Sequence, residues 1–403
     1  MLNIALLGST GSIGTSTLEV IGANLNKFNV KLLAADSNDK LIFEQCIKFH
    51  PDYVHLNNIS SAKDLTSSLS SEGLHTSVLD ELDFLEIVSN SEIDVVIAGI
   101  VGIAGLKSVH KAVESGKRVL LANKESFVVA GELLNKLAKQ NESVIFPLDS
   151  EHSAIHQCLA GRKEISKQIQ RLILTGSGGP FLRKKLEEFS KITPKEAITH
   201  PVWSMGKKIS VDSATMMNKG LEIIEAKWLF NIDSEKIDVL IHPEGIVHSL
   251  VEFKDNSIIG QMSVPDMKVP IAYGLGFPER IESNSESLRL EHIGQLNFIT
   301  PDLKKFPSIS IAREAVNSGG TASALLNAAN EEAVRAFLKN KINFTQISEI
   351  ISFVMDTIPI TNVKELGSIF EADSLGRESV SYTHLRAHET EAERVCRLLL
   401  EKK

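Results

Sequence analysis

Short apolar runs alternate with longer amphipathic segments along the first 149 residues. The runs have the length and side chains of buried strands, and the segments between them repeat their apolar positions with the period of a helix. The predicted strands are residues 2–7, 30–35, 95–98, 119–122 and 144–146, and two clear helices are residues 16–24 and 106–115. This alternation predicts an α/β fold in which a parallel, Rossmann-type sheet over residues 1–149 carries helices on both faces.

The pattern changes after residue 150. A helical segment is followed by predicted strands at residues 171–175, 239–241, 246–253 and 258–263, which indicates a second α/β domain over residues 150–277. Residues 278–310 contain three prolines and a Ser/Glu-rich stretch, and they indicate a linker. Helical periodicity over residues 311–317, 322–338, 345–356 and 363–379 predicts a C-terminal helical bundle over residues 311–380.

Composition narrows the class of protein. A length of 403 residues allows two or three domains, and a formal net charge of -8 argues against a nucleic-acid partner. Cys46, Cys158 and Cys396 lack the spacing of zinc or disulfide sites, which fits a reducing compartment. No apolar run is long enough to span a bilayer, and a strand pattern begins at Leu2, so we expect a cytoplasmic protein without a membrane partner.

Three glycines, Gly8, Gly11 and Gly14, follow the first predicted strand and open the first helix. Glycines at this place permit a tight turn and the close approach of a pyrophosphate, whose charge the helix N-terminus attracts. The loop therefore predicts a dinucleotide site, with a purely structural turn as the alternative. The other residues of the turn that offer backbone N–H groups are Thr10, Ser12 and Ile13.

The second predicted strand ends at Asp36, where the adenosine ribose is expected. An acidic residue there accepts a hydrogen bond from the ribose 2′-hydroxyl and favours NAD. Ser37 and Asn38 follow it and can donate to a 2′-phosphate. The loop alone leaves the choice between the two dinucleotides open.

Polar residues also follow two later strands. Asn123, Lys124 and Glu125 come directly after one of them, at the sheet edge where ligands bind in such folds. Asp149 and Glu151 follow another, and two crowded carboxylates are relieved by Mg²⁺ or Mn²⁺. The structural alternative for this pair is an N-cap aspartate with a glutamate in the first helical turn.

Residues 200–226 gather histidine, lysine, serine, asparagine and glutamate side chains in one segment. Its first half contains Pro and Gly and predicts a loop, and its second half, from about Ser213, predicts a helix. Asn218 and Glu222 are four residues apart and share one helix face, with Lys219 beside them. This set suits an anionic substrate, and Glu222 offers a third oxygen ligand to a metal.

A second glycine-rich loop, residues 175–181, contains Ser177, which can hold an anion. Gly178 and Gly179 would also allow the segment after them to close as a mobile lid. His200 and Trp203 lie on that predicted lid.

The remaining histidines carry weaker signals. His242 and His248 flank a strand pattern, and we expect them to be structural. His152 and His156 are four residues apart on a helix, a spacing that zinc accepts, but we expect packing or supporting roles because the carboxylates suit a harder metal.

Six motifs occur in order along the chain: GSTGSIG, LANKES, DSEH, TGSGGPF, HPVWSMGKKISVDSATMMNKGLE and LNAANEEAV. Together they resemble the 1-deoxy-D-xylulose 5-phosphate reductoisomerase family over roughly residues 1–380. The resemblance implies an NADPH-dependent homodimer of the non-mevalonate isoprenoid pathway that needs Mg²⁺, Mn²⁺ or Co²⁺. Such an enzyme rearranges 1-deoxy-D-xylulose 5-phosphate and reduces the resulting aldehyde to 2-C-methyl-D-erythritol 4-phosphate.

The resemblance also implies that residues 150–277 are the catalytic domain, and it implies residue roles. The expected metal ligands are Asp149, Glu151 and Glu222. Together with Lys124 they form the expected catalytic set. The residues expected to hold the substrate are Lys124, Ser150, Glu151, Ser177, His200, Ser213, Asn218, Lys219 and Glu222. Those expected to line the cofactor are Thr10, Gly11, Ser12, Ile13, Asn123, Glu125, Met205 and Gly206, with Asp36, Ser37 and Asn38 at its ribose.

Two departures from the family pattern stand out. Asp36 and Ser37 occupy positions where many members carry a glycine and a basic residue, which leaves open the margin by which NADPH is preferred over NADH. Residues 381–403 do not resemble the family's C-terminal end and have the character of a foreign tail. We therefore do not interpret His384, His388 and Cys396 as a metal site.

Two other functions share some of these sequence features. A semialdehyde or homoserine dehydrogenase would share the dinucleotide domain, but the former needs a cysteine nucleophile and Cys158 has no evident activating partner. A sensor that has lost its chemistry would have lost metal ligands, whereas Asp149, Glu151 and Glu222 are all present.

Overall fold

The computed structural model describes residues 1–160, 162, 165–203 and 206–383. The chain divides into two compact units. Unit 1 contains Met1–Phe127, Gly131–Thr175 and Glu225–Phe298, and unit 2 contains Val128–Ala130, Gly176–Ile224 and the chain from Ile299. Each unit is described separately below.

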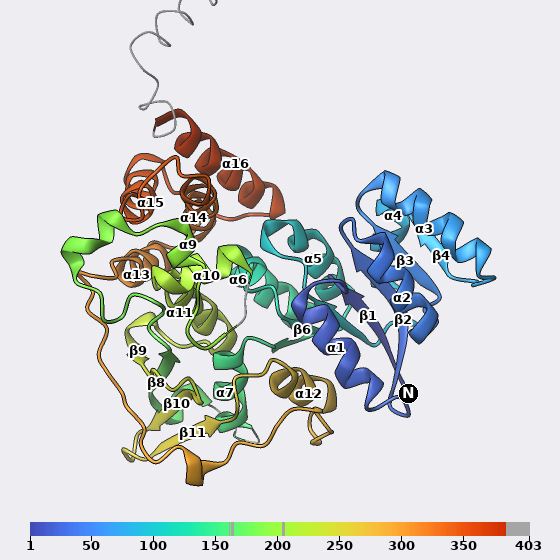
Figure 1. Cartoon of the computed structure of the whole chain (residues 1–403), viewed down its shortest axis with the longest axis horizontal. Coiled ribbons are helices and arrows are strands. Elements are labelled where there is room, and N and C mark those ends of the chain that lie inside the picture. Colours follow the sequence, from blue (N-terminus) through green and yellow to red (C-terminus); the bar gives the residue numbers. More distant parts are fainter. Residues whose placement is uncertain (161, 163–164, 204–205, 384–403) are drawn as a thin grey trace, which may run out of the picture. The chain divides into compact units, whose positions relative to one another are not determined.

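Unit 1 contains a seven-stranded parallel sheet (Figure 1). Its strand order is β4-β3-β2-β1-β5-β6-β7, so the direction of winding reverses between β1 and β5. In such sheets ligands bind outside the carboxyl ends of the strands at this reversal. The strands are β1 (Leu2–Leu7), β2 (Phe28–Ala35), β3 (Tyr53–Leu56), β4 (Ser77–Leu79), β5 (Val95–Ala98), β6 (Arg118–Leu121) and β7 (Val144–Pro147).

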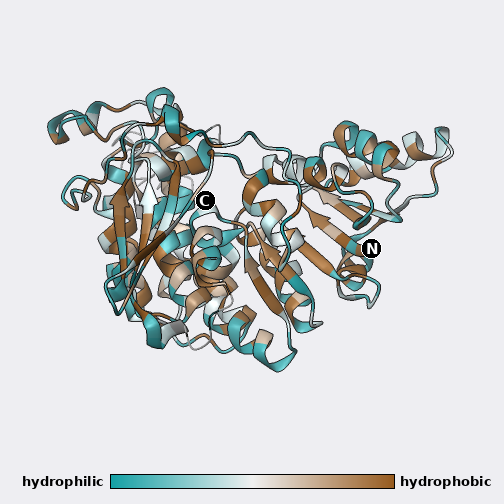
Figure 2. Ribbon diagram, turned by 90° about the horizontal axis from the view of Figure 1, so that it is seen from below, coloured by the Kyte–Doolittle hydropathy of each residue, from teal (hydrophilic) through white to brown (hydrophobic). Residues whose placement is uncertain are grey.

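Helices connect these strands as the sequence pattern predicts. They are α1 (Ser12–Gly22), α2 (Asp39–Phe49), α3 (Ile59–Ser71), α4 (Glu81–Ser89), α5 (Leu106–Glu114) and α6 (Lys124–Gln140). The five predicted strands are confirmed, but β3 and β4 were missed because they are short and each has a polar residue among its apolar ones. Figure 2 shows the apolar residues concentrated on the strands and on the helix faces that cover them.

Unit 1 also contains a four-stranded sheet of order β11-β10-β8-β9. β10 pairs antiparallel with both β8 and β11, and α7 lies against β10 and β11. α12 packs on α1 and places Ile271 and Tyr273 in the core of the larger sheet. The elements of this region are α7 (Ser150–Leu159), α8 (Ile165–Gln168), β8 (Ile169–Gly176), β9 (Ile237–Ile241), β10 (Val247–Phe253), β11 (Ile258–Met262) and α12 (Lys268–Gly276).

Unit 2 is helical. The predicted C-terminal helices are confirmed, with α14 at its predicted limits and α16 continuing past residue 380 to Thr383. Residues 384–403, which include His384, His388 and Cys396, lie outside the described residues. The helices are α9 (Pro194–Ala197), α10 (Lys207–Ala214), α11 (Met217–Phe230, whose end belongs to unit 1), α13 (Ser308–Ser318), α14 (Ala322–Leu338), α15 (Gln346–Thr357) and α16 (Leu366–Thr383).

The helical prediction for residues 200–226 needs a correction. Helix begins at Lys207, earlier than the predicted Ser213, and it is interrupted before α11. Met216 takes a left-handed conformation with φ of 60°, which ends α10 and turns the chain into α11. Ser213 therefore lies on a different helix from Lys219.

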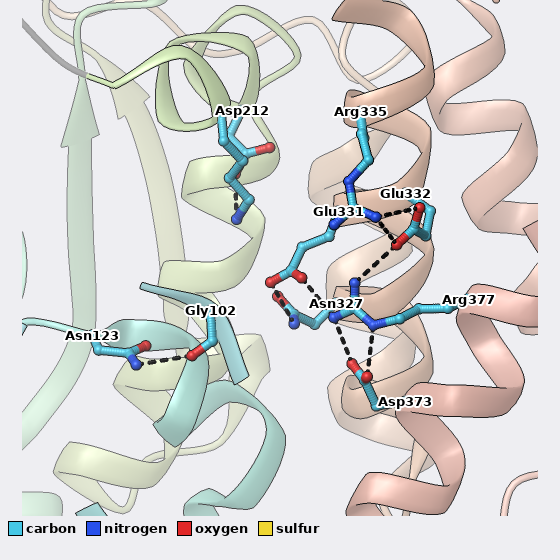
Figure 3. A network of polar contacts seen from close by, with 10 residues as sticks. Gly102, Asn123, Asp212, Asn327, Glu331, Glu332, Arg335, Asp373 and Arg377 are labelled. Carbon is cyan, nitrogen blue, oxygen red and sulfur yellow. Dashed lines mark hydrogen bonds and ion pairs between the residues drawn. The ribbon is translucent and has the colours of Figure 1, made fainter. Parts of the chain in front are cut away.

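A group that we call the arginine network joins α14 to α16 (Figure 3). Arg377 of α16 donates to both oxygens of Asp373 at 2.7 and 2.9 Å, and it reaches Glu331 at 2.6 Å and Glu332 at 3.1 Å. All four side chains are mostly buried. The network is therefore a buried, bidentate connection of the kind that arginine geometry favours.

None of the helices in the described part of the chain combines the length and the apolar character needed to cross a membrane.

Candidate active site

The glycine loop is a tight turn between β1 and α1 that only glycine fits at two positions. Gly8 has φ of +86°, and a Cβ there would lie 2.5 Å from the carbonyl oxygen of Gly99. A Cβ on Gly14 would collide with the backbone of Gly8 and Ser9. Gly11 caps α1 without a side-chain hydrogen bond, so the first turn keeps N–H groups for a ligand. The loop thus fits the pyrophosphate of a dinucleotide.

A cavity of about 420 Å³ opens beside this loop in unit 1. Thr10 and Gly11 line it, as does Asp36 at the end of β2. Ser37 and Asn38 do not line it, and the side chain of Asn38 instead accepts from the Leu41 N–H at 3.2 Å and caps α2. The volume and the lining suit the adenosine end of a dinucleotide.

Asn123 ties the start of α6 to the turn after β5. Its oxygen accepts from the Ser126 N–H at 3.2 Å and caps α6, and its nitrogen donates to the carbonyls of Ile100 and Gly102, the latter at 2.9 Å (Figure 3). Both ends of this amide are used by the protein. Asn123 therefore fixes the backbone beside the glycine loop, and Lys124 and Glu125 follow as buried residues of the first turn.

Asp149 lies at the start of α7 and forms a buried ion pair with Lys124, at 2.5 Å between Nζ and Oδ2. Its other oxygen accepts from the Glu151 N–H at 3.1 Å, so the N-cap alternative is also correct for this residue. Ser150 donates to the carboxylate of Glu151 at 2.6 Å. Asp149 and Glu151 present the hard oxygen ligands that Mg²⁺ and Mn²⁺ prefer, so the donor set fits such a cation.

His152 contacts the carboxylates of Asp149 and Glu225. Its Nδ1 lies 3.3 Å from Asp149 and 3.0 Å from Glu225, and both His152 and Glu225 are fully buried. Burial opposes a charge on the ring, but the carboxylates of Glu225 and Asp149 outweigh it and hold the pKa of His152 well above its ordinary value. We call Lys124, Asp149, Glu151, His152 and Glu225 the acid cluster.

Glu225 was given no role from the sequence. The sequence did contain evidence for a role of Glu225, because Glu222 and Glu225 are three residues apart on α11 and share a face. The spacing could not identify His152 as its partner.

In unit 2 the predicted amide, ammonium and carboxylate set of α11 is present. Glu222 is fully buried, and its two oxygens accept from Asn218 and from Lys219, each at 2.5 Å. The second glycine loop lies against this set, because a Cβ on Gly176 would meet the Lys219 side chain at 3.1 Å.

Ser177 and His200 are joined by a hydrogen bond of 3.0 Å between Oγ and Nε2. Nδ1 of His200 accepts from the backbone N–H groups of Val202 and Trp203, so the ring proton is on Nε2 and is donated to Ser177. Burial, and then the charge of Lys219, lower the pKa of His200 to about 4. The hydroxyl hydrogen of Ser177 is therefore directed to another acceptor.

Ser213 approaches the same loop through its backbone. Gly179 has φ of +64°, and a Cβ there would lie 2.8 Å from the Ser213 carbonyl oxygen. Unit 2 thus brings the loop of Ser177 together with α10 and α11. Gly206 caps α10, whereas Met205 lies outside the described residues.

The other histidines behave as structural residues. His242 contacts Glu244 at 2.9 Å and the Asn297 carbonyl at 2.8 Å, and His248 contacts the Ser263 carbonyl at 3.2 Å. His156 is hydrogen-bonded to the Tyr273 hydroxyl at 2.8 Å. Cys158 is buried, and burial raises its pKa to about 11, which does not suit a nucleophile.

Comparisons with known proteins agree on one family. Its family models match three stretches of the chain: 1-deoxy-D-xylulose 5-phosphate reductoisomerase at residues 4–131, the C-terminal domain of the same enzyme at residues 145–230, and the DXP reductoisomerase C-terminal domain at residues 262–379. The 1-deoxy-D-xylulose 5-phosphate reductoisomerase of Nitrosomonas eutropha is 47% identical over 381 residues, covering 94% of this chain and 92% of that protein. That of Cellvibrio japonicus is 46% identical over 383 residues, covering 93% and 96%.

Solved structures agree with these matches. A crystal structure of DOX-P reductoisomerase in complex with NADPH, fosmidomycin and magnesium superimposes with a TM-score of 0.92 at 41% identity, covering 97% of this chain and all of that one. The enzyme of Zymomonas mobilis in complex with NADPH superimposes with a TM-score of 0.89 at 39% identity, covering 94% and 98%.

Proposed function

The chain belongs to the 1-deoxy-D-xylulose 5-phosphate reductoisomerase family, and from that membership we propose which of its residues perform the reaction. The enzyme converts 1-deoxy-D-xylulose 5-phosphate to 2-C-methyl-D-erythritol 4-phosphate with NADPH and a divalent metal. The observation that carries the assignment is the buried Lys124–Asp149 pair beside Glu151, at the carboxyl edge of the sheet that bears the glycine loop.

Asp149, Glu151 and Glu222 would hold the cation. Each presents a carboxylate at a helix, the first two at the start of α7 and the third on α11. When bound, the cation stabilises negative charge on the oxygens of the substrate, and NADPH supplies the hydride. The acid cluster prepares this site because His152 and Lys124 hold Asp149 in one orientation.

The unit 2 residues would hold the substrate and its phosphate. Ser177 accepts a hydrogen bond from His200, and its own hydroxyl hydrogen is then positioned for a phosphate oxygen. Lys219 adds positive charge, and Asn218 adds an amide. Ser150 and Ser213 would complete the set, and Lys124 would lie at the reacting end.

The lid role is also a proposal. The positive φ angles of Gly178 and Gly179 and the loop at residues 200–203 support closure over the substrate. Trp203 would then give the lid an apolar surface that excludes water from the aldehyde. On the cofactor side, Thr10, Gly11, Ser12 and Ile13 would bind the pyrophosphate, Asn123 and Glu125 the nicotinamide half, and Gly206 with Met205 the nicotinamide.

A direct assay tests the assignment. Oxidation of NADPH is followed by absorbance after addition of 1-deoxy-D-xylulose 5-phosphate, first in chelated enzyme and then after addition of Mn²⁺ or Mg²⁺. We expect oxidation only with both substrate and metal, and a loss of about a thousandfold in Glu151→Gln. Glu132→Gln, an exposed change on α6, is the matched control. Oxidation that needs no metal, or full activity in Glu151→Gln, contradicts the metal assignment.

We further propose that the enzyme is a cytoplasmic homodimer, as the family resemblance implies. Light scattering of the purified protein tests the dimer, and a mass of one chain at micromolar concentration contradicts it.

A further inference from the structure

The cavity beside the glycine loop has an unusual charge for a site that receives a 2′-phosphate. Its charged lining residues are Asp36, Glu81 and Lys107, which gives two carboxylates against one ammonium. Among the described residues that line it, Lys107 is the one lysine or arginine. The charged residues that line the cavity therefore carry a net negative charge where the adenosine end of the cofactor is expected.

Asp36 is held in place by the next strand end. Its Oδ1 accepts from Asn57 Nδ2 at 3.1 Å, and its backbone carbonyl accepts from the Asn58 N–H at 2.8 Å. Asp36 is an exposed residue that lines the cavity, and these two hydrogen bonds hold it in place. A fixed carboxylate at the end of β2 accepts a hydrogen bond from a ribose 2′-hydroxyl and repels a 2′-phosphate.

The N-terminus of α2 does not compensate for this repulsion. The side chain of Asn38 already satisfies the Leu41 N–H, and Asp39 adds another carboxylate in the first turn. Both features reduce the attraction of this helix end for an anion.

Lys107 is the group that can favour the 2′-phosphate. It lies in the first turn of α5, with its Nζ 3.7 Å from Glu81 Oε1. Both side chains are more than half exposed, so the pair is loose and Lys107 can exchange Glu81 for a phosphate.

We propose, resting on the function proposed above, that Asp36 and Lys107 set the choice of dinucleotide by acting in opposite directions. Asp36, positioned by Asn57, favours the 2′-hydroxyl of NADH, and Lys107 favours the 2′-phosphate of NADPH. Exposed charges of this kind each change affinity by up to about fivefold, so NADPH and NADH bind to this enzyme within about tenfold of each other.

Binding measured without substrate or metal tests the proposal. Dissociation constants of NADPH and NADH are obtained by fluorescence titration, and those of 2′,5′-ADP and 5′-AMP by calorimetry, since this second pair differs only in the 2′-phosphate. Asp36→Asn should tighten NADPH and 2′,5′-ADP about fivefold and weaken NADH about twofold. Lys107→Gln should weaken NADPH and 2′,5′-ADP about fivefold and leave NADH and 5′-AMP within twofold.

Two further variants separate this effect from a general disturbance of the fold. Lys111→Gln lies on the same helix, pairs with Glu114 and does not line the cavity, so it should change no constant beyond twofold. Asn57→Ala should weaken NADH more than NADPH, whereas a purely structural role would weaken both equally.

The proposal is overturned if the NADH-to-NADPH ratio of dissociation constants moves less than twofold in both Asp36→Asn and Lys107→Gln. It is also overturned if the wild-type enzyme prefers NADPH more than a hundredfold and Lys107→Gln retains that preference. Because no sugar phosphate is used, failure of the proposed reaction would leave these binding results unaffected.

Discussion

The acid cluster of unit 1 and the arginine network of unit 2 contain the same kinds of charged side chain, but their roles differ. Each gathers three carboxylates with basic side chains in a mostly buried place. In the network, Arg377 directs a planar fork of donors at Asp373, Glu331 and Glu332 and satisfies them within the protein (Figure 3).

The cluster is satisfied differently. Lys124 and His152 both contact Asp149, and Glu151 bonds to its neighbour Ser150. A lysine and a histidine can rearrange or exchange protons, and the carboxylates keep the capacity to bind a hard cation. The comparison teaches that a buried charged group favours stability when its cation is a fixed arginine, and favours chemistry when its cations are a lysine and a histidine that can move or exchange protons.

The largest expected effect comes from Asp149→Asn in the cluster. Removing the negative charge of the Asp149 carboxylate should lower kcat about a thousandfold. The dissociation constant of NADPH should stay within twofold, because the glycine loop is unchanged. The rate of NADPH oxidation and a fluorescence titration measure the two quantities. A variant that keeps a tenth of the activity would show that Asp149 has a structural role. The acid cluster and the arginine network would then not differ in function.

Arg377→Met in the network should show the converse. It leaves Asp373 and Glu331 without their arginine, whereas Glu332 keeps Arg335 at 2.8 Å. The loss should lower the free energy of unfolding by about 2–3 kcal/mol, while kcat at 25 °C stays within threefold. Denaturant unfolding and the activity assay supply the values. A large loss of kcat in folded enzyme would show that the network also supports the site.

The two groups should also differ in their response to pH. The raised pKa of His152 means that its stabilising charge is fully present below about pH 6.5 and is lost as pH rises through the folded-state pKa. The stability difference between wild type and His152→Gln should therefore shrink as pH rises in chelated protein. The difference between wild type and Arg377→Met should stay constant from pH 6.5 to 9, because guanidinium does not titrate there. Parallel changes in the two differences would contradict the contrast.

The smallest effect is expected from an exposed arginine that also pairs with more than one carboxylate. Arg171 lies 2.8 Å from Asp238 and 2.5 Å from Glu252, but it is 44% exposed. Arg171→Met should change the free energy of unfolding by at most about 1 kcal/mol. A loss equal to that of Arg377→Met would mean that the burial of an ion pair does not set its contribution to stability.

Much of the fold could be predicted because its strands are apolar throughout. Every residue of β5 is buried, and the run that forms it stands out in the sequence. β3 and β4 could not be found in this way, since Tyr53–Leu56 and Ser77–Leu79 depend on pairing with a neighbour already in the sheet. The break at Met216 was missed for a related reason, because a left-handed residue other than glycine is stable only when its surroundings impose it.

The candidate site divides in the same way. Asp149 was assigned both a cap and a possible metal role, and the fold shows that one oxygen caps α7 while the other meets Lys124. Glu225 was left without a role because its partner His152 is 73 positions away in the sequence, and no local rule links them.

The sequence by itself determined the fold class, the glycine turn, the order of the motifs and, through them, the family. These are local properties, since the hydrophobic period and the steric freedom of glycine act over a few residues. Only the tertiary structure decided which charges meet: Lys124 with Asp149, His152 with Glu225, and Asn57 with Asp36. The reason is physical, because a charge or a hydrogen bond acts through distance in space, and the chain brings distant residues together only when its sheets and helices have packed.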